Sequence, residues 1–138
     1  MEKDKAKTKK GQGMNLFDYK ELIDHKPMHI ATVNSENNPN LAVAADVNVI
    51  KENELIISAN EMSHTQENIS HNPNVVITVF DKDWVGIRLF GKAKFYTEGE
   101  YFNYCKNKFF GHGEVTKFGA TEPKGAIVVT VEKVEEYK

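Results

Sequence analysis

One short segment of the sequence combines the residue types that a phosphate-binding turn needs. An apolar, strand-like run ends just before Asn60, and Ser63 precedes Gln66 by three residues, which is the spacing of a helix capping box. The first backbone N–H groups of a helix have no partner within it, and the helix dipole is positive at that end. Ser63, His64 and Thr65 add two hydroxyl groups and an imidazole to those donors. The segment is therefore a candidate phosphate site, although a capping box that binds nothing is the simpler local interpretation.

The rest of the chain predicts a sheet of short antiparallel strands that would hold this segment in place. Runs rich in β-branched residues alternate with polar turns, and no long crossover helix separates most of them. We expect about six strands, at residues 28–33, 41–50, 54–59, 74–80, 85–96 and 125–134. Three short helices are expected at residues 16–25, 63–72 and 98–109. A closed or nearly closed antiparallel barrel with helices outside it follows, because closure removes exposed sheet edges.

The candidate phosphate segment resembles the phosphate-binding turn of the FMN-binding split barrels, the family that includes the pyridoxamine-phosphate oxidases. Thr65 stands at the hydroxyl position of that turn, Asn68-Ile69 forms its Asn–aliphatic pair, and Pro73 is its later proline. His64 departs from the pattern, since it stands where the family usually has a lysine or an arginine. A histidine side chain is only partly charged at neutral pH. The resemblance therefore implies a phosphate affinity that is weaker, or more dependent on pH, than with lysine.

The resemblance extends over residues 28–134 and rests on the order of the elements as well as on the turn. It implies a mainly β (α+β) fold, a six-stranded antiparallel split β-barrel with flanking short helices. It also implies FMN as the cofactor and a homodimer in which both subunits contact each cofactor. The flavin carries the redox chemistry itself, so a small-molecule substrate or a redox partner is expected and no catalytic residue is predicted.

The same resemblance points to further residues that would contact the cofactor. Three small residues of the second predicted strand would line the flavin ring: Ala44, Ala45 and Asp46. The two alanines could equally be small residues of the core. Asn60 is a further candidate for the phosphate or the ribityl chain. Arg88 could reach a phosphate or a flavin carbonyl, but a surface or interface ion pair is the simpler role. Trp84 is expected on the strand face of Arg88, as an interface anchor.

The charge of the chain is unevenly distributed. The formal net charge is -2, yet residues 1–10 hold five lysines against two acids, so the remainder is net negative. We expect residues 1–13 to form a disordered basic leader and residues 14–138 to form one FMN-binding split-barrel domain. This balance makes a surface built for nucleic acid an unfavoured interpretation.

Cysteine content and hydropathy favour a cytoplasmic location. Cys105 is the only cysteine, so no disulfide can form within the chain. Its place on the apolar face of a predicted helix indicates a small core residue. No apolar run approaches the roughly 20 residues of a membrane span, and no signal peptide is visible. We therefore expect a cytoplasmic protein without membrane association.

Three functions stay open at the level of the sequence. The first is an FMN-binding flavoprotein that acts as an oxidoreductase or an electron carrier. The second keeps the barrel and replaces FMN by haem or a deazaflavin, with His64 and His112 as candidate axial ligands of haem. The third is a small barrel that binds single-stranded nucleic acid through the lysine-rich leader and surface aromatic residues. A structural metal is not expected, because no third ligand stands near the paired histidines.

Overall fold

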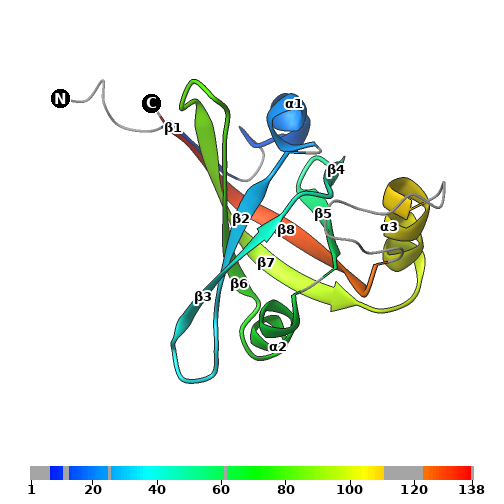
Figure 1. Ribbon diagram of the computed structural model, residues 1–138. Helices are drawn as coiled ribbons and strands as arrows, with labels where there is room; N and C mark the ends of the chain where they lie inside the picture. Colours follow the sequence, from blue (N-terminus) through cyan, green and yellow to red (C-terminus); the bar gives the residue numbers. More distant parts are fainter. Residues whose placement is uncertain (1–6, 11–12, 25, 61, 111–122, 138) are drawn as a thin grey trace.

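The structure, a computed structural model, describes residues 7–10, 13–24, 26–60, 62–110 and 123–137 (Figure 1). Its strands are β1 (Lys7–Lys10), β2 (Met28–Val33), β3 (Pro39–Ala44), β4 (Val47–Lys51), β5 (Glu54–Ala59), β6 (Asn74–Phe80), β7 (Gly86–Tyr96) and β8 (Gly125–Glu136). Its helices are the 3-10 helix η3 (Leu16–Tyr19) and the α-helices α1 (Lys20–Ile23), α2 (Ser63–His71) and α3 (Glu100–Phe110). Every strand pairing is antiparallel, so the predicted fold class, mainly β with short flanking helices, is confirmed.

The two ends of the sheet belong to one continuous stretch of chain. The strand order is β3-β2-β6-β7-β8-β5-β4, with β1 added on β8. β3 and β4 therefore lie at opposite ends of the order, yet only Ala45 and Asp46 separate them in the sequence. The sheet must curl until its ends meet at this bend, which is how an antiparallel sheet becomes a barrel. We call the bend at Ala45 and Asp46 the seam (Figure 1).

The seam corrects the single strand that the sequence predicted at residues 41–50. Every odd position of this stretch is apolar, as on the buried face of one strand: Leu41, Val43, Ala45, Val47 and Val49. In the structure, however, Leu41 and Val43 of β3 are 65% and 51% exposed, whereas Val47 and Val49 of β4 are buried in the core. The face that carries the apolar residues changes from outside to inside at the seam. A regular sequence pattern cannot reveal such a change, because it depends on which sheet edge each half joins.

The core fills the inside of the curled sheet and is closed by helices at both ends. Leu16 and Ile23 bring η3 and α1 onto the core at one end of the barrel, and Ile69 brings α2 onto it at the other (Figure 1). All three side chains are buried, and Leu16 and Ile23 have no exposed surface. Burying an aliphatic side chain of this size contributes about 1.5–3 kcal/mol. The two ends of the barrel are thus fixed by the same apolar core.

Helix α3 lies outside the barrel, on the strands β5 and β8. Its Cys105 forms a second apolar cluster with Ile56, Ala126 and Val128, and it has no exposed surface. The predicted role of Cys105 as a core residue is confirmed. Burial raises the pKa of its thiol to about 12. None of the described helices is long and apolar enough to span a membrane.

Part of the predicted disordered leader is a strand. β1 pairs with the last residues of β8, with Thr8 opposite Glu135 and Lys9 opposite Val134. β5 pairs with β8 only as far as Thr130, so β1 supplies backbone partners where β5 no longer does. β1 and the division of residues 41–50 raise the number of strands among the described residues to eight, from the expected six. Residues 1–6, also predicted to be disordered, lie outside the described residues.

Two further predictions from the sequence, a helix at residues 16–25 and the position of Trp84, differ from the structure in detail. The predicted helix at residues 16–25 is a 3-10 turn followed by one α-helical turn that ends at Ile23. Trp84 was expected on the strand face of Arg88, but it lies in the turn before β7, with φ +63°. A residue in this turn does not follow the alternation of the strand, so Trp84 does not share the face of Arg88.

Candidate functional site

The seam carries a small group of connected polar side chains. The Asp46 carbonyl accepts a hydrogen bond from the Ser58 N–H at 2.9 Å, which fastens the bend to the end of β5. The Ser58 hydroxyl donates to Asn60 Oδ1 at 3.0 Å, and Asn60 Nδ2 donates to Asp46 Oδ2 at 3.4 Å. Ser58 and Asn60 are buried. The structure therefore brings together Asp46 and Asn60, which the sequence analysis selected from two separate segments.

Helix α2 begins immediately after this polar group, and its first turn has no side-chain cap. The residue before the helix is Met62, whose carbonyl accepts from the Gln66 N–H at 2.9 Å. Ser63 is already the first helical residue, so the predicted capping box is wrong: Ser63 stands one position too late to serve as the cap. An uncapped helix start leaves its first N–H groups without acceptors from the helix itself. These donors and the positive end of the dipole suit an anion.

The candidate side chains of this turn have different exposures. Ser63 and His64 are exposed, whereas Thr65 is 1% exposed and turned into the protein. Ser63 and His64 can therefore meet a ligand from solvent directly. Thr65 can contribute only where a ligand approaches the buried side of the turn.

Asn68 holds α2 in place. The sequence pointed to this residue only through the resemblance of its turn to that of the split barrels. Asn68 Nδ2 donates to the Thr32 hydroxyl of β2 at 3.0 Å, and both residues are buried. A hydrogen bond between two buried side chains is costly to break, because each group would be left without a partner. Asn68 thus positions the start of α2 relative to the sheet. Its sequence signal was the polar residue beside Ile69 on an otherwise amphipathic helix.

Helix α3 borders the seam from outside. Asn48, two residues beyond Asp46, donates from Nδ2 to the Tyr104 hydroxyl at 2.9 Å. The electrostatic influence of Asp46 also contributes to the raised pKa of Cys105, the next residue of α3. Asn48 Oδ1 is buried and has no hydrogen-bond partner. Sequence reasoning missed Asn48 and Tyr104, since only the tertiary fold brings α3 onto β4.

Arg88 lies apart from the other candidates within one protomer. It faces Thr78 of β6 and Glu135 of β8 across the sheet, and its Nε lies 3.3 Å from Glu135 Oε1. Its guanidinium also lies 5.0 Å from the ring centroid of Tyr137. Near α2, the Ala93 N–H of β7 donates to the Pro73 carbonyl. Ala93 lies about 16 Å along the strand from Arg88, so Arg88 is far from α2. Within one protomer, Arg88 therefore forms the predicted surface ion pair, with Glu135.

The outer face of the sheet near Arg88 is partly apolar. His29 of β2 faces Val43 on one side and Thr78 on the other, so one cross-strand row runs from Val43 to Arg88. Leu41 and Val43 are exposed on this face. Exposed apolar residues that gather on one face indicate a surface that another molecule covers.

His29, His64 and His71 are the histidines that the structure describes. Among the described residues, no three His, Cys, Asp or Glu side chains are grouped so that they could hold a metal ion. His112, a candidate axial ligand of haem, lies outside the described residues. His64 and His71 both belong to α2 and are exposed.

A curled antiparallel sheet that is joined at one seam, with short helices packed outside it, defines a split β-barrel. Residues 18–138 match the pyridoxamine 5'-phosphate oxidase family, and the chain belongs to that family. The resemblance that the sequence turn suggested is thereby confirmed for most of the chain.

Known proteins resemble this chain at modest sequence identity, and two of them are solved structures with a similar fold. An uncharacterized protein of Methanocaldococcus jannaschii, MJ0282, is 28% identical over 120 residues, which cover 84% of this chain and 76% of the relative. The crystal structure of HupZ from Group A Streptococcus is 25% identical, with a TM-score of 0.73 over 86% of this chain and 90% of HupZ. An FMN-binding protein from Syntrophomonas wolfei is 22% identical, with a TM-score of 0.69 over 80% of this chain and 76% of that protein.

Proposed function

We propose that this chain is an FMN-binding flavoprotein that acts as an oxidoreductase or an electron carrier. The observation that carries the proposal is the uncapped start of α2 directly beside the polar group of the seam. The phosphate of FMN would take the free N–H groups of α2, together with Ser63 and His64. The flavin ring would lie along the seam. The FMN-binding relative with the same fold supports this choice of cofactor.

The residues at the seam fit a planar cofactor. Ala45 is partly exposed at the seam and has a small side chain, so a ring can approach the backbone closely there. Ala44, the other predicted alanine, is 3% exposed and packs in the core. Asp46 and Asn60 supply a carboxylate and an amide beside that surface. When bound, FMN supplies reversible one- and two-electron chemistry. The protein would hold the ring, orient its polar edge toward the amide of Asn60 and limit the access of water.

The outer face of the sheet supports a homodimer. Leu41 and Val43 are more than half exposed, although they are as apolar as the core. A second copy of the chain on this face would bury them, and it would place Arg88 of one protomer near the partner subunit. In that arrangement Arg88 would reach a cofactor that both subunits share, which one protomer alone does not allow. Cofactor binding and dimer formation would then depend on each other.

Titration of the purified chain with FMN, riboflavin and FAD tests the proposal. We expect saturable quenching of flavin fluorescence, with FMN bound more tightly than riboflavin because only FMN carries the phosphate. Equal affinity for FMN and riboflavin would remove the phosphate site at α2. Binding of haem or of a deazaflavin, with none of FMN, would keep the barrel and replace the proposed cofactor.

A further inference from the structure

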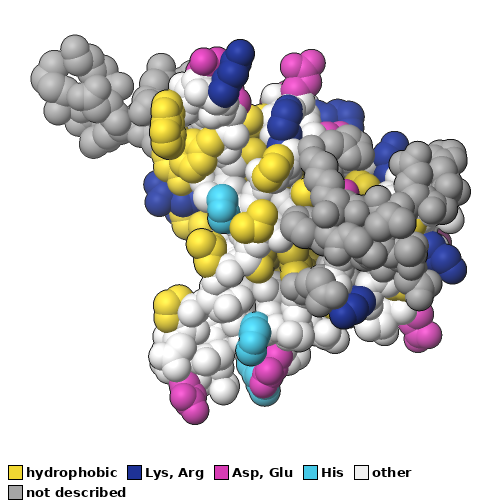
Figure 2. Space-filling model, viewed as in Figure 1, with side chains coloured by type: hydrophobic (Ala, Val, Ile, Leu, Met, Phe, Trp, Pro, Cys, Tyr) yellow, Lys and Arg dark blue, Asp and Glu magenta, His cyan; other side chains and the backbone are white. Residues whose placement is uncertain are grey.

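The turn between β6 and β7 holds the only tryptophan of the chain in a fixed position. Oδ1 of Asp81 accepts from the N–H groups of Asp83 at 2.8 Å and Val85 at 3.1 Å, and the Trp84 N–H donates to the Asp81 carbonyl at 3.2 Å. Trp84 has φ +63° and is 76% exposed. A large side chain rarely adopts this backbone conformation. Figure 2 shows hydrophobic side chains gathered over this turn.

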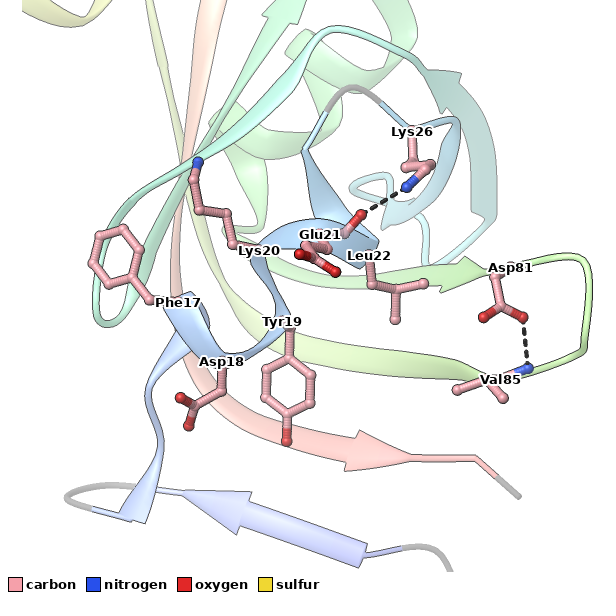
Figure 3. Close-up of a pocket in the computed structure, with 9 residues that line it drawn as sticks. All are labelled: Phe17, Asp18, Tyr19, Lys20, Glu21, Leu22, Lys26, Asp81 and Val85. Atoms are coloured by element: carbon pink, nitrogen blue, oxygen red, sulfur yellow. Dashed lines mark hydrogen bonds between the residues drawn. The ribbon is translucent and has the colours of Figure 1, made fainter.

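A hollow of about 480 Å³ opens beside Trp84, a volume that suits a small ligand. It lies between the turn, the first helical segment and the end of β8. Its walls include the aromatic rings of Tyr19, Trp84 and Tyr137. A second hollow of about 700 Å³ adjoins it and shares the walls Tyr19, Leu22 and Val85. Figure 3 shows the second hollow, with the Tyr19 ring extending from the helical segment toward β8.

Both charged side chains among the described walls of the hollow beside Trp84, those of Asp83 and Glu136, are acidic. Tyr19 donates from its hydroxyl to Glu136 Oε1 at 2.7 Å, and burial together with this bond raises the pKa of Tyr19. Tyr19 therefore stays protonated and holds the Glu136 carboxylate at the wall. The side chain of Asp83 is exposed and has no partner among the described residues.

The lysines that line the adjoining hollow already have partners. Lys20 pairs with Asp24, one turn later in the chain. Lys26 Nζ donates to the Glu21 carbonyl at 2.6 Å, as Figure 3 shows. Neither lysine lines the hollow beside Trp84. The described walls of the hollow beside Trp84 therefore include no lysine or arginine, although Lys7 of β1 is paired with Glu136 in the sheet.

The rings of this hollow already attract cations of the protein. Lys9 Nζ lies 5.6 Å from the ring centroid of Tyr19, and the Arg88 guanidinium lies 5.0 Å from that of Tyr137. Trp84 is the third ring, and no cation of the described residues lies over it. Tryptophan offers the most favourable ring face for a cation. Trp84 makes an edge-to-face contact with Phe80, with 6.0 Å between the ring centroids, and its indole otherwise stands exposed beside two carboxylates.

We propose that this hollow binds a small organic ammonium ion. The apolar substituents of the ligand contact Trp84 and Leu22, while its positive nitrogen lies toward Asp83 and Glu136. This site goes beyond the proposed flavin function, because it lies at the opposite end of the barrel from α2 (Figure 1). It needs neither FMN nor the seam.

Trp84 also provides the measurement, since the chain has one tryptophan. The fluorescence of the full chain and the single indole N–H signal in its NMR spectrum both report on this hollow. Choline is the probe, and its uncharged carbon isostere dimethylbutanol is the matched control. We expect a saturable shift of both signals with choline and none with the alcohol. Equal shifts with both compounds, or none with choline, would overturn the proposal.

Two variants test the carboxylates. We expect Asp83→Asn and Glu136→Gln each to weaken choline binding about tenfold, because each removes one of the two negative charges. Glu67→Gln is the control, since it removes an exposed carboxylate from α2 at the other end of the barrel. Asp83→Asn leaves the bond between Tyr19 and Glu136 intact, so its effect cannot come from a loosened fold. Unchanged affinity in both variants would contradict the proposed site.

Discussion

Asn60 donates from Nδ2 to Oδ2 of Asp46 across 3.4 Å, and this contact joins the end of β5 to the bend between the two sheet edges. Asn60→Ala removes that bond and also the acceptor of the Ser58 hydroxyl. We expect a loss of about 1–3 kcal/mol in the free energy of unfolding. We also expect FMN to bind about tenfold more weakly, because the seam no longer holds one shape. Urea unfolding and fluorescence titration measure the two effects.

Asn103→Ala is the matched control for this substitution. Asn103 is an exposed asparagine of α3, and its side chain belongs to none of the hydrogen bonds that join Asp46, Ser58 and Asn60. Asn103→Ala should leave both the free energy of unfolding and the FMN affinity unchanged. If Asn60→Ala lowers stability while FMN affinity stays the same, the polar group supports the barrel and does not contact the cofactor.

His64→Lys should tighten the binding of FMN. A lysine ammonium places a positive charge at the exposed start of α2, beside the N–H groups proposed for the phosphate. Fluorescence titrations with FMN compare the two chains. Equal FMN affinity in both chains would place the phosphate away from position 64. His71→Lys at the other end of α2 is the control, and it should leave the FMN affinity unchanged.

Leu41→Glu and Val43→Glu should prevent dimer formation without unfolding the protomer. Both side chains are more than half exposed in one protomer, so a carboxylate there costs little until a second copy must cover it. Sedimentation at micromolar concentration should show a dimer for the natural chain and a monomer for the variants. The monomeric variants should also bind FMN more weakly, because the proposed cofactor site needs both subunits. Phe17→Glu changes an exposed apolar residue of η3 and should leave the dimer intact.

Cys105 should be unreactive in the folded protein. Burial raises its thiol pKa to about 12, so the thiolate that reacts with disulfide reagents and maleimides is scarce at pH 8. A thiol whose pKa is raised by folding also makes the folded state less stable at high pH, because the unfolded chain can ionise first. Labelling should therefore be slow in buffer and rapid in denaturant. Rapid labelling of the folded chain would show that α3 opens away from β5.

The order and type of most elements could be predicted from the sequence. β-branched runs and polar turns located β2, β5 and β6 to within a residue or two, and the spacing of Phe102, Cys105 and Phe109 located α3. These signals are local, since each depends on residues a few positions apart. The candidate phosphate turn was selected in the same way, from the hydroxyl and imidazole residues at the start of α2, and it stays a prediction.

The contacts that define the candidate site could not be predicted. The seam is invisible in the sequence because the alternation of apolar residues continues through Ala45 and Asp46. The contacts of Asn48 with Tyr104 and of Asn68 with Thr32 join residues far apart in the chain. The capping box was misread by one position, since Met62 offered no side-chain signal that the helix begins after it.

The seam leaves β3 as an edge strand, paired only with β2 in the described sheet, and the exposed side chains of that edge are apolar. An uncovered edge of this kind offers backbone hydrogen bonds and an apolar surface to any other strand, and it is a starting point for aggregation. A second copy would shield it. Leu41→Lys should act as a gatekeeper against precipitation, because its charge opposes the pairing of this edge with another strand.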